Sequence, residues 1–321
     1  VVGKNFWRVI LPNKTARPKR KKKRPNFVKK ARRYLVYLLV LVLRRFVLFL
    51  PFKWTFKITP ILAVLAYYLF RRERLKTLKH LRLAYGAEKS ESEIRVIAKE
   101  VFRNIGRSAA ENLSWNKLGV KYLENHVTIV NPEGLKRGFD KGKGLIGLTG
   151  HLGNWELMGA VFAKMLNVRF AVVARDFSNP WLNKKFEEER KAMGFDVVYR
   201  GNSGIEVLRR LKRNEGLGIL ADQNIRGEGV FVPFFGHPVK AHSNIAKLII
   251  RTGVSVVPVF IIRNKDLTTH TLFIDNPMIF SLSGNIDEDI KNISSAYTAV
   301  IEKYVRQYPD QWMWMHKRWG D

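Results

Sequence analysis

The pattern of hydrophobic and polar positions divides the chain into an apolar helical part and an α/β part. From Glu73 onward, short apolar runs rich in β-branched residues alternate with stretches of helical periodicity. We expect strands at 127–130, 145–149, 170–174, 197–199, 217–221, 254–262 and 271–274. We expect helices at 90–115, 154–166, 179–193, 203–213, 243–252 and 287–307. This alternation predicts an α/β fold with a mixed central sheet flanked by helices.

Before residue 73 the pattern is different, because long apolar runs dominate. Residues 34–52 are apolar apart from Arg44 and Arg45, and residues 58–70 form another apolar run. A membrane-spanning helix needs about 20 apolar residues, and each arginine at the bilayer centre costs about 2.5–3.5 kcal/mol. We therefore expect membrane-associated helices at 34–72 that lie within one leaflet. A tilted single span and a buried helical hairpin are the alternatives.

The distribution of charge supports contact with a membrane. The chain of 321 residues has a formal net charge of +31, and 20 of its 58 Lys and Arg residues precede Glu73, the first acidic residue. Residues 1–33 are predicted to be a basic arm, with the run KRKKKR at 19–24. Such a run is also typical of nucleic-acid binding, but next to acid-free apolar helices it favours an anionic membrane surface. The α/β domain would then occupy residues 73–321.

The composition limits the chemistry that this protein can perform. Hydrophobic residues make up 46% of the chain, enough for a core, and cysteine is absent. The absence of cysteine excludes thiol nucleophiles, iron–sulfur clusters and cysteine-ligated zinc. His237 and His242 have no third ligand at a plausible spacing, so we expect no bound metal and no bound cofactor.

The segment 144–159, GLIGLTGHLGNWELMG, carries the strongest candidate for catalysis. A strand should end at Thr149 and a helix should begin near Asn154, so His151 should lie in a loop at the carboxyl end of a strand, where active sites of α/β proteins gather. If the loop folds back, the Glu156 carboxylate could reach His151 Nδ1 and leave Nε2 free as a base. The alternative is a surface histidine beside a glutamate stabilised by the helix dipole.

Two further polar residues follow predicted strands. Arg175 could bind a phosphate or form an ordinary salt bridge, and Asp222 could belong to the site or cap a turn. Trp312, Trp314 and Trp319 are expected to pack in the core rather than at a membrane interface.

These residues also carry a resemblance to a known family. His151 and Glu156 have the HX4(D/E) spacing of glycerolipid-type acyltransferases, and HLGNWE is similar to the lipid A late acyltransferases. Four further blocks resemble that family in the same order. They are Ala174-Arg175 with Asn179-Pro180, Arg190 and Gly194; Ala221-Asp222-Gln223 with GVFVPFFG at 229–236; Val257-Pro258-Val259; and PDQW at 309–312 with HKRW at 316–319.

The resemblance implies a glycerolipid-acyltransferase-like fold and an O-acyltransferase. The enzyme would move a fatty acyl chain from acyl carrier protein, or coenzyme A, to a hydroxyl of a membrane glycolipid, a lipid A precursor, at the cytoplasmic face of the bacterial inner membrane. It implies His151 as the base and Glu156 as its partner. Substrate-binding residues would be Arg175, Asp222, Gly153 and Asn154. Ornithine lipid, inositol mannoside or lysophospholipid acceptors are the alternatives, and a nucleic-acid binder is a more distant one.

Overall fold

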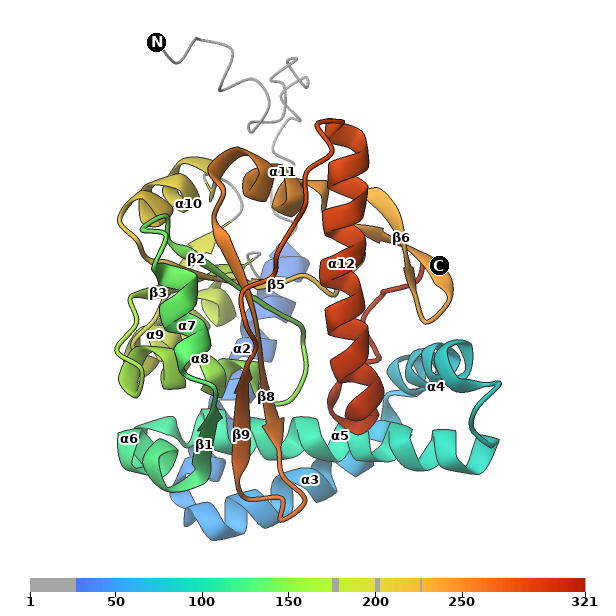
Figure 1. The fold of residues 1–321 in the computed structure, drawn as a ribbon. Coiled ribbons are helices and arrows are strands. Elements are labelled where there is room, and N and C mark those ends of the chain that lie inside the picture. Colours follow the sequence, from blue (N-terminus) through green and yellow to red (C-terminus); the bar gives the residue numbers. More distant parts are fainter. Residues whose placement is uncertain (1–26, 175–178, 200–202, 226, 321) are drawn as a thin grey trace.

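The computed structural model describes residues 27–174, 179–199, 203–225 and 227–320. Its centre is a seven-stranded sheet (Figure 1). In order across the sheet the strands are β1 (Val127–Val130), β9 (His270–Ile274), β8 (Ser255–Arg263), β2 (Leu145–Thr149), β5 (Gly216–Leu220), β3 (Phe170–Ala174) and β4 (Asp196–Tyr199). Neighbouring strands are parallel except for β8 and β9, which are antiparallel. The prediction of a mixed sheet is therefore confirmed.

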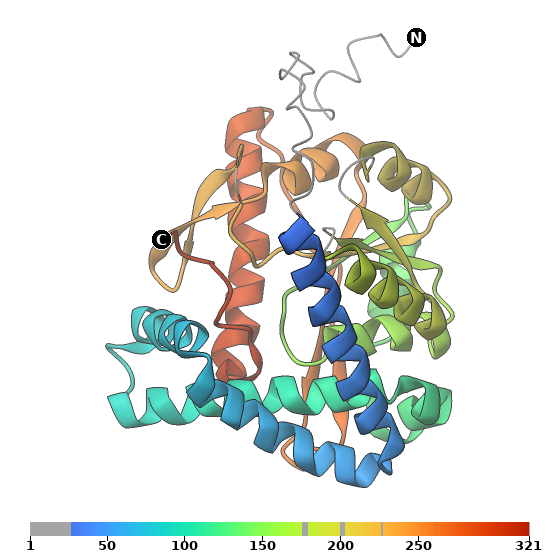
Figure 2. The ribbon, with the colours of Figure 1, turned by 180° about the vertical axis from the view of Figure 1, so that it is seen from behind.

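Helices cover both faces of this sheet (Figures 1 and 2). They are α2 (Phe27–Phe49), α3 (Phe52–Leu69), α4 (Arg71–Tyr85), α5 (Glu91–Leu113), α6 (Trp115–His126), α7 (Glu133–Phe139), α8 (Trp155–Lys164), α9 (Pro180–Met193), α10 (Ser203–Lys212), α11 (Ser243–Thr252) and α12 (Ile286–Gln307). A short 3₁₀ turn, η1, spans Pro309–Gln311.

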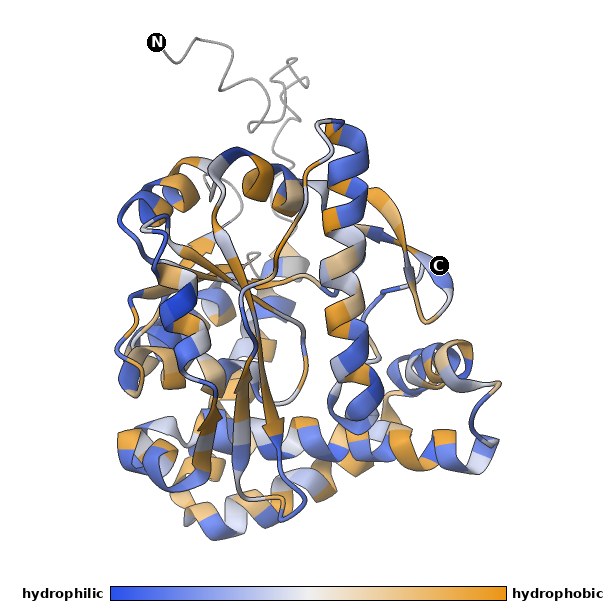
Figure 3. Ribbon diagram, in the orientation of Figure 1, coloured by the Kyte–Doolittle hydropathy of each residue, from blue (hydrophilic) through white to orange (hydrophobic). Residues whose placement is uncertain are grey.

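Successive side chains of each strand point to opposite faces, so the sheet has two hydrophobic cores. On β8, Val256 and Phe260 join the core that includes α11 and α12, whereas Val257 and Val259 join the core beneath α7 and α8. All nine residues of β8 are buried. The strands accordingly stand out as hydrophobic in Figure 3, as expected for a sheet covered on both sides.

Two elements depart from the sequence-based expectation. Strands β6 (Val230–Phe234) and β7 (His237–Ala241) form a separate antiparallel hairpin where no strand was predicted. Each contains a proline, which argues against a strand because proline cannot donate to the ladder. Pro233 and Pro238 face one another across the hairpin, so neither interrupts the bonding of a longer sheet.

The amino-terminal helices also differ in detail from the expectation. Helix α2 begins at Phe27, inside the stretch expected to be a basic arm, and continues through Arg44 and Arg45. Arg44 turns toward α9 and pairs with Glu189 at 3.1 Å. Its charge is thus neutralised by the protein. Among the described residues, none of the helices combines the length and the apolar character that crossing a membrane requires.

Candidate active site

Neighbouring strands bring the two principal site residues together. β2 and β5 pair in parallel with Thr149 opposite Leu220. His151 follows β2 by two residues and Asp222 follows β5 by two residues, so both lie beyond the same edge of the sheet. Asp222 Oδ1 lies 2.8 Å from His151 Nδ1, and Asp222 Oδ2 accepts a hydrogen bond of 2.7 Å from the backbone N–H of His151.

The Asp222 carboxylate is completely enclosed and fully bonded. It is 1% exposed, and Trp312 Nε1 donates to its Oδ2 at 2.8 Å. Burial by itself raises the pKa of Asp222, but attraction to His151 and the hydrogen bonds from His151 and Trp312 hold this pKa well below its usual range. Asp222 is therefore an anion, which can only accept, so His151 Nδ1 carries a proton, and in the neutral imidazole the lone pair is on Nε2.

The contact expected between His151 and Glu156 is not formed. Glu156 is paired with Arg190 of α9 through two hydrogen bonds, of 2.9 and 2.5 Å. Glu156 lies in the first turn of α8, and its side chain faces α9. The backbone between positions 151 and 156, which is part loop and part helix, directs the Glu156 side chain away from His151. The expectation of Glu156 at His151 Nδ1 is corrected: Asp222 occupies that position.

A second histidine lies beside the free nitrogen of His151. The His316 ring centroid is 4.7 Å from that of His151. The side-chain amide nitrogen of Gln223 lies 3.2 Å from Nε2 of each histidine, so its two protons can be donated to both rings. Burial, followed by repulsion from His151, lowers the pKa of His316 to about 4. His316 is therefore neutral at neutral pH.

The loop that carries His151 is fastened to the C-terminal segment. The N–H of Met313 donates to the His151 carbonyl at 3.0 Å, and the N–H of Gly153 donates to the Gln311 carbonyl at 3.1 Å. Gly153 has φ +61°, and a Cβ here would lie 1.8 Å from the Ile261 carbonyl oxygen. Only glycine permits this close approach of the loop to β8.

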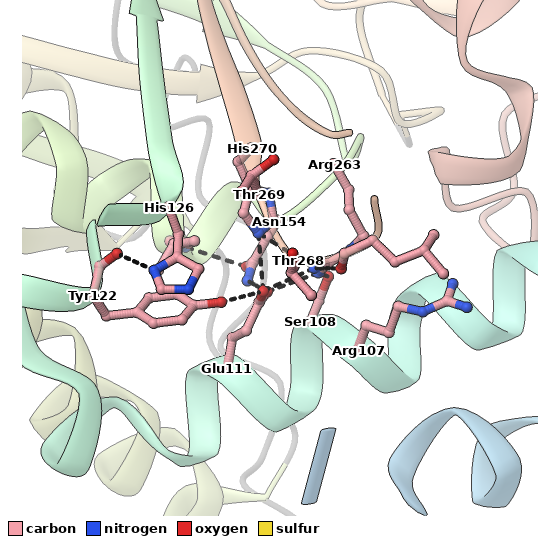
Figure 4. Close-up of polar contacts among 12 residues, drawn as sticks. Arg107, Ser108, Glu111, Tyr122, His126, Asn154, Arg263, Thr268, Thr269 and His270 are labelled. Carbon is pink, nitrogen blue, oxygen red and sulfur yellow. Dashed lines mark hydrogen bonds and ion pairs between the residues drawn. The ribbon is translucent and has the colours of Figure 1, made fainter. Parts of the chain in front are cut away.

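Beneath the loop, a buried polar cluster holds the start of α8 (Figure 4). Asn154 caps α8 by accepting from the N–H of Leu157 at 3.2 Å and donates to Glu111 Oε2 at 2.8 Å. Glu111, which is 0% exposed, also accepts from Arg263 and Tyr122. Both polar atoms of the Asn154 side chain are used inside the protein, so we assign this residue to shaping the loop.

The Glu111 carboxylate is ionised despite its burial. Burial alone would raise the pKa of Glu111, but the neighbouring His270 and Arg263 hold that pKa below the ordinary range. The Arg263 guanidinium lies 2.7 Å from the Glu111 carboxylate, and the backbone N–H of Arg263 donates to Gln311 Oε1 at 2.8 Å. The cluster therefore joins α5, β8 and the C-terminal segment into one support for the His151 loop.

The other predicted site residues have different outcomes. Arg175 lies outside the described residues and remains a prediction. Trp312, Trp314 and Trp319 are 0%, 0% and 5% exposed, so their predicted packing in the core is confirmed. His316 was not predicted as a site residue, although it belongs to the HKRW block that carries part of the family resemblance.

Comparison with known proteins places the chain in a family. Residues 21–320 match the family described as bacterial lipid A biosynthesis acyltransferase. The chain is 25% identical over 256 residues to the lipid A biosynthesis palmitoleoyltransferase of Escherichia coli, covering 78% of this chain and 79% of the relative. It is 24% identical over 204 residues to the phosphatidylinositol mannoside acyltransferase of Mycolicibacterium smegmatis, covering 61% of this chain and 64% of that protein. The corresponding mannoside acyltransferase of Mycobacterium tuberculosis is 25% identical over 185 residues, which cover 56% of this chain and 55% of the relative.

Proposed function

The chain belongs to the bacterial lipid A biosynthesis acyltransferase family, and we propose that it is an O-acyltransferase, which transfers a fatty acyl chain from an acyl thioester to a hydroxyl group of a membrane glycolipid. Acyl carrier protein is the proposed carrier of the thioester, and coenzyme A is the alternative. The observation that carries the proposal is the 2.8 Å contact between His151 Nδ1 and Asp222 Oδ1. Asp222 holds the proton of His151 Nδ1, so the Nε2 lone pair is available as a base.

The reaction begins when the acceptor hydroxyl replaces the Gln223 amide at His151 Nε2. As the hydroxyl oxygen bonds to the thioester carbonyl carbon, its proton moves to Nε2, and Asp222 stabilises the imidazolium that forms. The tetrahedral intermediate then collapses with cleavage of the carbon–sulfur bond. The departing thiolate takes the proton back from His151, so the enzyme returns to its starting state and no acyl-enzyme is needed.

The neutral state of His316 suits this sequence of steps. A protonated imidazole beside His151 would oppose the positive charge that develops on His151 during transfer. With its pKa near 4, His316 leaves that charge unopposed. We propose that His316 and Gln223 contact the reacting oxygen atoms, with Gln223 as a hydrogen-bond donor toward the developing negative charge.

For the acceptor we propose a lipid A precursor. The relative with the larger coverage is named for lipid A biosynthesis, and the family description names the same pathway. A phosphatidylinositol mannoside is the second candidate, because two of the relatives are named for that acceptor. Both acceptors present sugar or acyl hydroxyls at a membrane surface, and the proposed chemistry at His151 is the same for either.

Mass spectrometry of membrane lipids tests the proposed function. Membranes containing the wild-type protein, incubated with an acyl thioester, should accumulate a glycolipid heavier by one acyl chain than its precursor. The His151→Ala protein, expressed to the same level, is the control and should leave the precursor unchanged. An unaltered lipid profile with both carrier protein and coenzyme A thioesters would contradict the proposal.

We further propose that helices α2 and α3 lie in the cytoplasmic leaflet of the bacterial inner membrane. Their exposed surfaces are mainly apolar, although five cations are exposed as well: Lys30, Arg32, Arg45, Lys53 and Lys57. Tyr34 and Tyr37 of α2 pack on α9 by contacting Trp181. Five apolar residues of α2 recur every three or four positions and thus line one face. They are Leu35, Leu39, Val42, Phe46 and Phe49, which are 59–86% exposed.

Charges placed on this face should detach the protein from membranes. The double variant Leu39→Glu/Phe46→Glu should move from the membrane fraction to the soluble fraction after a high-salt wash. The reason is that burying a charged carboxylate at the centre of the bilayer costs about 2.5–3.5 kcal/mol. The control Val96→Glu/Ile205→Glu adds the same charges at other exposed apolar positions. It should remain with the wild type on the membrane. Wild-type protein washed off by salt alone would instead indicate a purely electrostatic attachment.

A further inference from the structure

A basic recess lies where α3, α4 and α5 meet. These three helices lie at one end of the molecule (Figures 1 and 2). The recess has a volume of about 440 Å³ and is lined by the last turn of α3, by α4 as far as its last turn, and by the first half of α5. Its lining combines tyrosines and leucines with four cations. These residues are Tyr67, Tyr68, Arg74, Leu75, Leu78, Arg82, Arg95 and Lys99. The active-site residues described above do not line it.

Two of the four cations have no acidic partner within the described part of the chain. Arg74 lies over the Tyr67 ring, 5.6 Å from its centroid, and donates to the Tyr68 carbonyl at 3.1 Å. Lys99 lies over the Tyr68 ring, also at 5.6 Å. Both charges are therefore held in place by aromatic faces rather than neutralised by carboxylates.

The other two cations share a single acid. Glu91 pairs with Arg82 at 2.5 Å and with Arg95 at 3.0 Å. One carboxylate thus serves two guanidinium groups, and the recess keeps an excess of positive charge. Oriented guanidinium and ammonium donors around a small cavity are suited to the oxygen atoms of a phosphate.

Apolar surface adjoins the recess directly. Tyr68, Leu69 and Phe70, at the end of α3, are 51%, 68% and 62% exposed. A soluble phosphate would make no use of this surface. A ligand that joins a phosphate to acyl chains would use both parts, with its phosphate in the recess and its chains along α3.

We propose that this recess binds the phosphate of an anionic phospholipid in the membrane. The bound headgroup would fix how the domain is oriented on the bilayer, because it ties α4 and α5 to the surface on which α3 rests. The inference rests on the proposed placement of α2 and α3 in the membrane, and it is independent of acyl transfer.

Vesicle binding by the full-length protein tests this assignment. The probes are phosphatidylcholine vesicles with and without phosphatidylglycerol. In Arg74→Gln/Lys99→Gln, the gain in binding caused by phosphatidylglycerol should fall about thirtyfold, the equivalent of about 1 kcal/mol for each cation at an anionic surface. The control Lys141→Gln/Lys212→Gln removes the same charge from exposed positions elsewhere, and it should retain most of that gain.

The outcomes separate the possible occupants. Equal losses in the two double variants would mean that only overall charge matters, and the recess would not be a lipid site. Loss of binding to acyl carrier protein, with an unchanged response to phosphatidylglycerol, would assign the recess to the carrier and overturn the lipid proposal. Retention of the phosphatidylglycerol response by Arg74→Lys/Lys99→Arg, with an unchanged melting temperature, would support it.

The same measurements keep this proposal apart from the proposed function. Binding to pure phosphatidylcholine reports on the apolar helices, whereas the increment caused by phosphatidylglycerol reports on the recess. His151→Ala should show the wild-type increment, since vesicle binding needs no turnover. Wild-type protein that transfers no acyl chain but shows the normal increment would refute acyl transfer and leave the recess assignment intact.

Discussion

The His151→Ala protein should transfer acyl chains about 10²–10⁴-fold more slowly than the wild type, because general base catalysis contributes a factor of this size. The variant should remain folded, since the His151 side chain is partly exposed at the edge of the sheet and its removal leaves the buried cores intact. The measurement is the rate of acyl transfer from a radiolabelled thioester to the isolated acceptor lipid.

His316→Ala provides a matched comparison for this result. It removes an imidazole from the same site but leaves the pair of His151 and Asp222 in place, so its loss of rate should be smaller. A folded His151→Ala protein with near-normal turnover would end the proposed mechanism. If His316→Ala were the more damaging of the two, the base would have to be reassigned to His316.

The second large effect is expected at Asp222. Asp222→Asn should lower kcat about 10²–10⁴-fold with little change in KM, because an amide at this position no longer requires Nδ1 to carry the proton and no longer stabilises the imidazolium. The decrease in kcat caused by Glu156→Gln should be at least about tenfold smaller than that caused by Asp222→Asn. A glutamine at position 156 can still accept a hydrogen bond from Arg190, and it has no contact with His151.

Comparing these two decreases in kcat distinguishes the observed pair, His151 with Asp222, from the pair suggested by sequence spacing, His151 with Glu156. If Glu156→Gln were as damaging to kcat as Asp222→Asn, with an unchanged melting temperature, Glu156 would have to approach His151 when substrates are bound.

The fold could largely be predicted from local patterns. The strands at 127–130, 145–149 and 170–174 are found at the predicted residues, because a short β-branched run between glycines or polar turns has few other stable arrangements. A capping box of Ser90 and Glu93 starts α5 at Glu91, next to the helix start predicted at residue 90. The hairpin of β6 and β7 could not be predicted, since its prolines are tolerated only because of how the two strands face one another.

The site was predictable only as far as its individual parts. The chain itself indicates that His151 and Asp222 each follow a strand, so both could be placed at the carboxyl edge of the sheet. It does not reveal that β2 and β5 are neighbours, which depends on the order of all seven strands. Without that order, the nearest carboxylate in the sequence, Glu156, was the natural partner for His151. The contribution of His316 was hidden for the same reason, because 165 positions separate it from His151 along the chain.

The fastening of the His151 loop by the C-terminal segment has a consequence for the biogenesis of this enzyme. Gln311, Trp312 and Met313 come after the last α-helix and the last strand, yet they bond Gly153, Asp222 and His151. A ribosome-bound chain could therefore fold its complete sheet while these last bonds are still unmade. The nascent protein would be inactive until this segment emerges, so an unfinished or proteolytically clipped chain could occupy the membrane without modifying lipids.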